Sequence, residues 1–135
     1  MNQPSPAPPE SQCWAMLREA SIGRLALRNR DEIEVFPVNF VVDGATVVFR
    51  TAHGTKLDLI GDGAPCTFEV DEIDVAECLV WSVVLRGSAR PVRGHDAIIA
   101  TFDIEVPTWH AGHKPAYVRV SPRSITGRRF PVIPV

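Results

Sequence analysis

Residues 33–51, IEVFPVNFVVDGATVVFRT, contain the strongest fold signal in the sequence. β-branched and aromatic residues form two runs on either side of the Asp43-Gly44 pair. Such a pair between two apolar runs is typical of a tight turn that joins antiparallel strands. Pro37 has no backbone N–H to donate, so it predicts an edge or a bulge in the first strand. The stretch therefore predicts a β-hairpin.

The remainder of the chain contains further short strands, separated by glycines, prolines and brief helices. We expect strands at 24–28, 33–42, 45–51, 65–70, 78–93 and 117–120, and helices at 11–20, 54–60 and 97–102. Gly87 predicts a bulge or bend in the long fifth strand, and the prolines from Pro122 onward predict an irregular tail. Six strands favour a closed or partly closed antiparallel barrel, because closure removes exposed sheet edges. We predict a mainly β fold, a β-barrel with peripheral short helices.

Length and composition are those of one ordinary folded domain. The chain has 135 residues, of which 45% are hydrophobic and 22% are charged, so it is unlike a disordered chain. The formal net charge is −2. Because the chain lacks an excess of basic residues, it also lacks the field that draws proteins to nucleic acid. The composition therefore predicts no nucleic-acid partner.

The two ends differ from the centre of the chain. Residues 1–10 include four prolines and predict a flexible arm, followed by a single domain over 11–130 and a tail at 131–135. The start resembles no secretory signal, and no apolar run approaches the roughly 20 residues of a membrane span. Three cysteines without CxxC spacing fit neither a disulfide framework nor a zinc site. We expect a cytoplasmic protein with no bound metal and no membrane partner.

A candidate anion site lies where the second strand of the hairpin ends. Arg50, Thr51, Thr55 and Lys56 flank a predicted strand–turn–helix junction. Arginine can bind phosphate through two parallel hydrogen bonds, lysine adds a point charge, and the helix start offers backbone N–H groups. The GxxxxGK[ST] pattern of a phosphate-binding loop is absent. A pattern this short is more often an ordinary strand end with solvated charges, so both interpretations stay open here.

Two strand segments are candidates for contact with a planar ligand. The first segment is residues 37–39, where Pro37 interrupts the strand. The Asn39 side chain offers both a donor and an acceptor. In the later segment, alternation puts Trp81 and Val83 on one face of the strand and Ser82 on the other. Ser82 could bond the edge of a heterocycle. Each segment could equally be an ordinary barrel strand.

The loop at residues 108–116 contains Trp109, His110 and His113. It could cover a ligand, although an ordinary surface loop is the simpler interpretation. The two histidines have no cysteine or carboxylate at a spacing that would suit a metal site. Motifs of nucleophilic catalysis are also absent, so the sequence identifies no catalytic residue.

The order and spacing of five segments resemble the pyridoxamine 5′-phosphate oxidase-like family of flavin-binding split barrels, in particular the small branch related to nitroimidazole reductases. The resemblance extends from about Leu17 to Arg129. The segments are IGRLAL (22–27), FPVNFVVDGATVVFRTAHGTKLDLI (36–60), CTFEVDE (66–72), WSVVLRGSARPV (81–92) and VRVSPRSITGRRF (118–130).

The resemblance implies a six-stranded antiparallel barrel of Greek-key type, and a homodimer that holds FMN in the groove between two barrels. By this resemblance, the ribityl phosphate is bound by Arg50, Thr51 and Lys56, with Thr55 nearby. The isoalloxazine ring is lined by Pro37, Val38 and Asn39, approached by Trp81, Ser82 and Val83, and contacted by Trp109 from the partner subunit.

The resemblance further implies an FMN-dependent oxidoreductase that passes hydride or electrons through flavin N5 to a small substrate. A reduced nicotinamide nucleotide is the candidate electron donor. The chain has no match to the basic substrate-phosphate site of the vitamin B6 oxidase, so the substrate stays open. The alternatives are a non-enzymatic flavin- or haem-binding module and a deazaflavin-dependent reductase.

Overall fold

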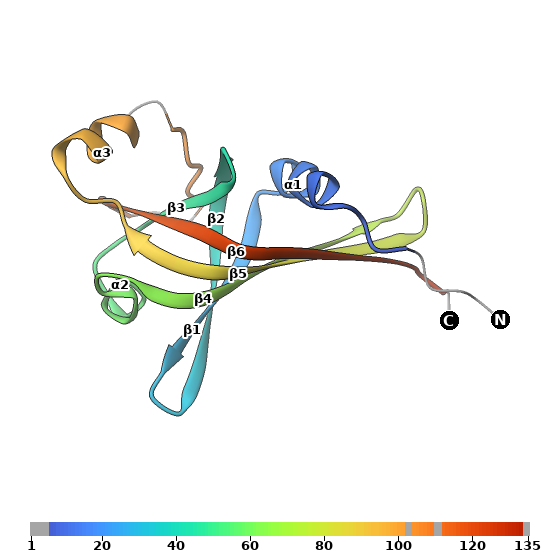
Figure 1. The fold of residues 1–135 in the computed structure, drawn as a ribbon, viewed down its shortest axis with the longest axis horizontal. Coiled ribbons are helices and arrows are strands. Elements are labelled where there is room, and N and C mark those ends of the chain that lie inside the picture. Colours follow the sequence, from blue (N-terminus) through green and yellow to red (C-terminus); the bar gives the residue numbers. More distant parts are fainter. Residues whose placement is uncertain (1–5, 102–103, 110–111, 134–135) are drawn as a thin grey trace.

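The computed structural model describes residues 6–101, 104–109 and 112–133. Within these ranges, six strands form one closed antiparallel barrel in the order β1-β2-β3-β6-β5-β4 (Figure 1). The pairing of β3 with β6 makes the connectivity that of a Greek key. The fold class expected from the sequence is confirmed. The elements are α1 (Glu10–Glu19), β1 (Ile22–Asn29), β2 (Glu32–Asp43), β3 (Thr46–Thr51), α2 (Thr55–Ile60), β4 (Ala64–Asp74), β5 (Leu79–Pro91), α3 (His95–Ala100) and β6 (Ala116–Pro131).

The hairpin between β2 and β3 forms where the sequence predicts it. β2 ends at Asp43, and Gly44 in the turn has a φ of +59°, a backbone conformation that favours glycine. Pro37 is paired with Arg24 of β1, whereas the pairing of β2 with β3 begins only at Phe40. Pro37 therefore lies at a sheet edge, where its missing N–H costs no ladder hydrogen bond.

The C-terminal strand is much longer than predicted. We expected a strand over 117–120 and then an irregular tail, but β6 continues to Pro131. Pro122 lies opposite Gly87, beside a register shift between Arg86 and Gly87. The N–H that proline lacks therefore falls at a β-bulge, and regular pairing continues beyond it. The expected bulge at Gly87 is confirmed, and the expected irregular tail from Pro122 is wrong.

Smaller differences concern the ends of other elements. β4 extends to Asp74, beyond the expected end at residue 70, because it pairs with β5 along its whole length. α3 begins at His95, two residues before the predicted start. The predicted helix end at Phe102 and the last tail proline, Pro134, lie outside the described residues.

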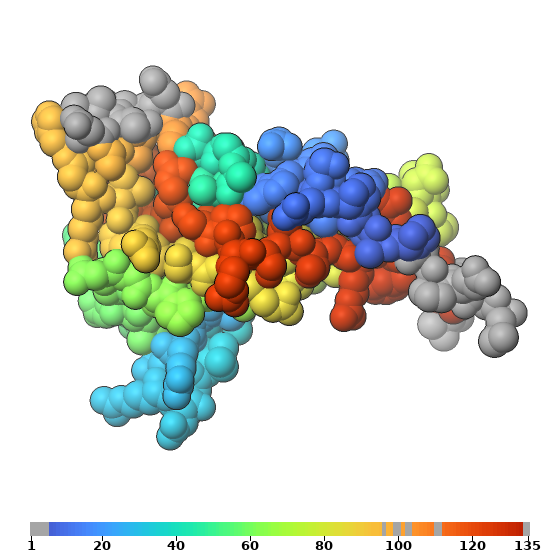
Figure 2. Space-filling view, in the orientation of Figure 1, coloured from blue at the N-terminus to red at the C-terminus, as the bar shows by residue number. Residues whose placement is uncertain are grey.

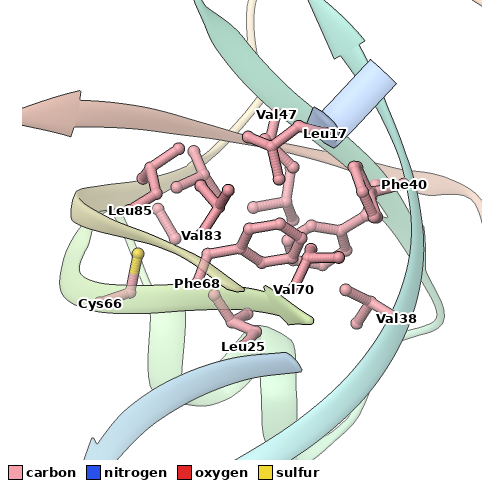
Figure 3. Packing of buried hydrophobic residues seen from close by; sticks show 14 of the residues in the cluster. Leu17, Leu25, Val38, Phe40, Val47, Cys66, Phe68, Val70, Val83 and Leu85 are labelled. Atoms are coloured by element: carbon pink, nitrogen blue, oxygen red, sulfur yellow. The ribbon is translucent and has the colours of Figure 1, made fainter. Parts of the chain in front are cut away.

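Apolar side chains fill the interior of the barrel (Figure 3). Phe40 and Phe68 meet edge to face, with ring centroids 5.0 Å apart, a favourable geometry for aromatic pairs. Leu17 of α1 is buried in the same core. Because side chains occupy the interior, a ligand of this protein has to bind on the outside of the barrel.

β4, β5 and β6 extend beyond the barrel as a three-stranded ribbon (Figure 1). The α1 segment packs on one face of this ribbon, because a Cβ added at Gly127 would lie 2.7 Å from both Cys13 Sγ and Pro8 Cγ. Pro8 of the expected flexible arm thus contacts the ribbon, whereas residues 1–5 lie outside the described residues. We call the opposite face of the ribbon, which continues onto the outside of the barrel, the outer face.

Replacing Gly87 with alanine tests the bulge. An added Cβ would lie 1.9 Å from the carbonyl oxygen of Ser121, so the two strands would have to separate. We expect Gly87→Ala to lower the free energy of unfolding by about 3 kcal/mol or more, the upper end of typical overpacking costs. Gly54→Ala, where nothing lies within 4 Å, should change it by less than about 0.5 kcal/mol. Urea denaturation measures both, and equal losses would contradict the close approach.

Candidate functional site

A hollow of about 320 Å³ lies on the outside of the barrel, where β3 ends and α2 begins. Its walls come from β2, from the β3–α2 junction, and from the segment that leads from α3 to β6. Six of the predicted site residues therefore surround one hollow. The lining residues are Pro37, Val38, Asn39, Arg50, Thr51, Ala52, Lys56, Pro107, Thr108 and Lys114.

Lys56 reaches the hollow from the first turn of α2 and is partly buried. Its Nζ lies 5.5 Å from the ring centroid of Phe36 and 5.8 Å from that of Phe49, close enough for the ring faces to attract the ammonium. Burial lowers the pKa of Lys56 below its ordinary value of 10.5, and the positive charge of Lys114 lowers this pKa further. A bound anion would oppose both effects, because it favours the charged form of the lysine.

Arg50 is held beside the same hollow by two contacts. Its Nε donates a hydrogen bond of 3.1 Å to the backbone carbonyl of Lys114. Its Cζ lies 5.1 Å from the centroid of the Tyr117 ring, a cation–π distance. The bond through Nε leaves the two Nη groups as donors for a ligand, and the two contacts limit the directions in which they can point.

Asn39 ties together two walls of the hollow. Its Nδ2 donates to the backbone carbonyl of Ser21 at 3.2 Å, and its Oδ1 accepts the backbone N–H of Trp109 at 2.9 Å. Both ends of the amide therefore bond to the chain itself. The side chain holds the 104–109 segment next to β2, and its expected contact with a planar ligand stays a prediction.

Three other predicted residues lie at or near the hollow in different ways. Thr51 lines it and is buried, with its Oγ1 donating to the carbonyl of Ala52 at 3.1 Å. Thr55 begins α2 and is exposed, but it is not among the lining residues. The Trp109 side chain is 67% exposed, although its backbone is tied to Asn39.

The structure does not bring residues 81–83 to this hollow within one chain. All three belong to β5. Val83 is fully buried in the barrel core and Trp81 packs against that core, so both side chains point away from the outer face. Ser82 points to the outer face, as alternation predicts. Any contact of Ser82 with a ligand in the hollow would have to come from a second copy of the chain.

Sequence reasoning missed four lining residues: Ala52, Pro107, Thr108 and Lys114. Ala52 directly follows Thr51, a predicted site residue, so its position in the sequence could have indicated it. Lys114 is next to β3 because Thr51 pairs with Ala116 at the start of β6. The sequence shows that Lys114 is a basic residue just before the last strand. It does not show that this strand pairs with β3, which is what brings Lys114 to the hollow.

Two kinds of feature are absent from the described part of the chain. The described residues contain no group of three or more His, Cys, Asp or Glu side chains that could hold a metal ion. None of its helices is long and apolar enough to cross a membrane. His110, one of the two loop histidines, lies outside the described residues.

Comparison with known proteins identifies the family. The sequence model of the pyridoxamine 5′-phosphate oxidase family matches residues 9–129. An uncharacterized protein of Mycobacterium tuberculosis is 37% identical over 90 residues, which make up 67% of this chain and 80% of that protein. The family expected from the sequence segments is therefore confirmed.

Two solved structures are similar over nearly the whole chain. A Corynebacterium glutamicum protein assigned to the pyridoxamine 5′-phosphate oxidases is 37% identical, with a TM-score of 0.86 over 100% of this chain and 99% of that chain. An FAD-binding protein from Mycobacterium smegmatis is 35% identical, with a TM-score of 0.80 over 94% and 99% of the two chains.

Removal of the Lys114 charge should raise the pKa of Lys56. In Lys114→Ala the like charge is gone but the burial remains, so the pKa should move toward 10.5 without reaching it. An NMR titration of the Lys56 side chain measures the value directly. Lys114→Arg keeps the positive charge and should leave the pKa almost unchanged; a rise of equal size in both variants would contradict the proximity of the two charges.

Proposed function

Because the chain belongs to the pyridoxamine 5′-phosphate oxidase family, we propose that it binds a flavin nucleotide in the hollow beside β2, β3 and α2 and acts as a flavin-dependent oxidoreductase. One observation carries the proposal. Arg50, Lys56 and Lys114 line a hollow that the apolar Pro37–Val38 stretch also lines. Positive charge and apolar surface in the same hollow suit a ligand that carries both a phosphate and a flat ring.

The donors present fit the phosphate of a flavin. The Arg50 Nη groups would donate hydrogen bonds to the phosphate. The partly buried ammonium of Lys56 has the like charge of Lys114 nearby, and the phosphate would supply an opposite charge that stabilises it. The backbone of Pro37 and Val38, at the sheet edge, would lie along the ring. When bound, the flavin supplies the redox chemistry, while the protein binds it, orients it and excludes water.

Whether the flavin is FMN or FAD is a separate part of the proposal. The similarity to an FAD-binding protein from Mycobacterium smegmatis supports a flavin. We propose FMN, because a hollow of about 320 Å³ is at the small end for ligand pockets, which span about 300–1,000 Å³. Chromatography of the cofactor released by heat distinguishes FMN from FAD.

A non-enzymatic flavin-binding role is the second candidate. The described residues that line the hollow include no Asp, Glu, His or Cys. The described part of this chain therefore supplies no carboxylate, imidazole or thiol that could act as acid or base there. A carrier or sensor needs no such group, and an oxidoreductase would rely on the substrate, a partner subunit or the flavin for proton transfer.

We also propose that the protein is a homodimer and that the second copy closes the hollow. Ile22, Ile33, Val35, Ile73 and Phe130 are exposed, and each lies an odd number of residues from a buried position of its own strand, so they point away from the core. Exposed apolar residues gathered on one side are typical of an interface. Pro37 and Asn39 share the outward direction of Val35 in β2, so a partner seated there would border the hollow.

The cellular location follows from the thiols. All three cysteines are free in the structure, which is the usual state in a reducing compartment. We therefore propose that the protein works in the cytoplasm.

Loss of the two cations should abolish tight flavin binding. We expect Arg50→Ala/Lys56→Ala to raise the FMN dissociation constant at least about 100-fold, because each hydrogen bond to a charged group contributes about 1.5–3 kcal/mol. Quenching of flavin fluorescence on titration measures the constant. Arg18→Ala, an exposed position on α1, should leave it unchanged, and equal affinity in all three proteins would show that the phosphate site is misplaced.

Reduction by a nicotinamide nucleotide separates an oxidoreductase from a carrier. The flavin-loaded protein should absorb at about 370 and about 450 nm, and anaerobic NADPH or NADH should bleach the longer-wavelength band. A loaded protein that neither nucleotide bleaches is a carrier or sensor. A Soret band in place of the flavin bands would identify haem and would refute the flavin proposal.

A further inference from the structure

A groove lined by arginines lies on the outside of the barrel, and it shares no lining residue with the hollow assigned to the flavin, which we call the flavin hollow. It consists of two adjoining hollows, of about 640 and 250 Å³, that share Pro65, Gly87 and Arg123. In Figure 2 the turn between β1 and β2 projects from the body of the molecule, and Ile33 of that hairpin lines the smaller hollow. We call the two hollows together the arginine groove, after the four arginines that line them: Arg28, Arg86, Arg90 and Arg123.

Strand geometry turns these arginines outward. Arg28, Arg86 and Arg90 each directly follow a residue that is buried in the barrel core, and successive side chains of a strand point to opposite faces. Arg123 reaches the surface in a different way. The register shift between Arg86 and Gly87 skips Arg123, so the bulge leaves this residue without a strand partner.

The positive charge of the arginine groove is not balanced within the described part of the chain. None of the four arginines forms an ion pair with any described residue. Asp62, the acidic residue among those that line the groove, already pairs with Arg93. Guanidinium groups without acidic partners repel one another, and a bound anion would offset this repulsion.

Two of the four arginines are oriented by contacts with the backbone. Arg28 Nε donates a hydrogen bond of 2.9 Å to the carbonyl of Arg30, which leaves both of its Nη groups as donors for a ligand. The Arg90 side chain runs along the backbone at Gly63, with its Cγ and Nε each 3.3 Å from the position of an added Cβ. Such contacts reduce the entropy that a guanidinium loses when it binds an anion.

The spread of the arginines indicates how many anionic groups they can bind. Arg86 and Arg90 lie four residues apart in β5, which is about 13 Å at about 3.3 Å per residue. Arg28 is in β1, which β4 separates from β5, so it lies roughly 10 Å from β5 at about 4.8 Å per strand. One phosphate has room for one or two guanidinium groups, whereas a chain of phosphates can pair with all four.

A short anion suits the arginine groove better than a long one. The chain as a whole has a formal net charge of −2, so the positive charge of the groove is local. Asp31 and Glu32 are exposed at the turn between β1 and β2, close in the chain to Arg28. A long polyanion such as a nucleic acid would extend to acidic residues of this kind, and a small anion would not.

We propose that the arginine groove is a second anion site, which binds a small molecule that carries two or more linked phosphate groups. The guanidinium groups would donate paired hydrogen bonds to the phosphate oxygens. The hydroxyls of Ser88 and Ser121, which are strand partners and line the larger hollow, would donate further hydrogen bonds. The site is separate from the flavin hollow, and the proposal does not depend on flavin binding.

The dimer proposed above would leave the larger hollow open. None of the exposed apolar residues assigned to the dimer interface lines that hollow. Ile33 lines the smaller hollow, so a partner seated on Ile33 would border the groove on that side. The ligand would therefore enter through the larger hollow, where Arg90 lies.

Calorimetric titration of the full chain with inorganic tripolyphosphate tests the site. We expect saturable binding whose dissociation constant rises at least about tenfold in Arg86→Gln/Arg123→Gln, because two charged partners are lost. The matched control Arg18→Gln/Arg128→Gln removes as much charge from exposed arginines that do not line the groove, and it should leave the constant almost unchanged. Orthophosphate should bind at least about tenfold more weakly than tripolyphosphate.

Three results would overturn the proposal: no saturable binding to the wild type, equal weakening in the two double variants, or equal affinity for orthophosphate and tripolyphosphate. ATP identifies the source of the phosphate chain. Tighter binding of ATP than of tripolyphosphate indicates a nucleotide and equal binding indicates an inorganic chain, and either result supports the site. If the double variant in the groove fails to fold, the single change Arg90→Gln at an exposed position should still weaken binding.

The flavin-hollow variant separates this site from the flavin site. Arg50→Ala/Lys56→Ala should keep tripolyphosphate binding and lose FMN binding, whereas the groove variant should keep FMN binding. Tripolyphosphate binding that is lost only in the flavin-hollow variant overturns the second site and leaves the flavin proposal in place. A wild type that binds tripolyphosphate but no FMN supports the second site and refutes the flavin proposal alone.

Discussion

The pairing of β6 with both β3 and β5 is the constraint on which the rest of the structure depends. Its first residues pair with β3 and close the barrel, and almost its whole length pairs with β5. The strand can continue that far only because Pro122 meets Gly87 at a bulge, where a missing N–H and a missing side chain are both tolerated. Closure then brings Lys114 next to Arg50 and so builds the third wall of the hollow.

A barrel that is filled with its own side chains leaves function to its outside, and unpaired charges are the best guide to where that function lies. The Lys56 ammonium lies near two aromatic rings and is affected by the like charge of Lys114. A bound anion would stabilise the charged form of this lysine. Arg86, Arg90 and Arg123, which line two other hollows on the surface, likewise form no ion pair with any described residue. The two places differ in how far their cations are spread, so the flavin hollow suits one phosphate and the arginine groove several.

Local patterns were the reliable part of the sequence analysis, and long-range pairing was the unreliable part. The Asp43-Gly44 turn and the edge position of Pro37 depend on backbone geometry within a few residues, and both were predicted correctly. The continuation of β6 was not, because the defect at Pro122 is compensated by Gly87 in another strand. Asn39 illustrates the same limit at the site: its polar groups were visible in the sequence, but their partners, Ser21 and Trp109, were not.

The sequence by itself determined the strand–turn–helix from Arg50 to Lys56, the alternation that sends Ser82 to the outer face, and the family, because each of these depends on neighbouring residues or on the order of segments. Only the tertiary structure decided that Lys114 joins Arg50 and Lys56 and that residues 81–83 lie away from the hollow. The physical reason is that such distances are set by barrel closure and strand register, and these come from pairing between segments that lie far apart in the chain.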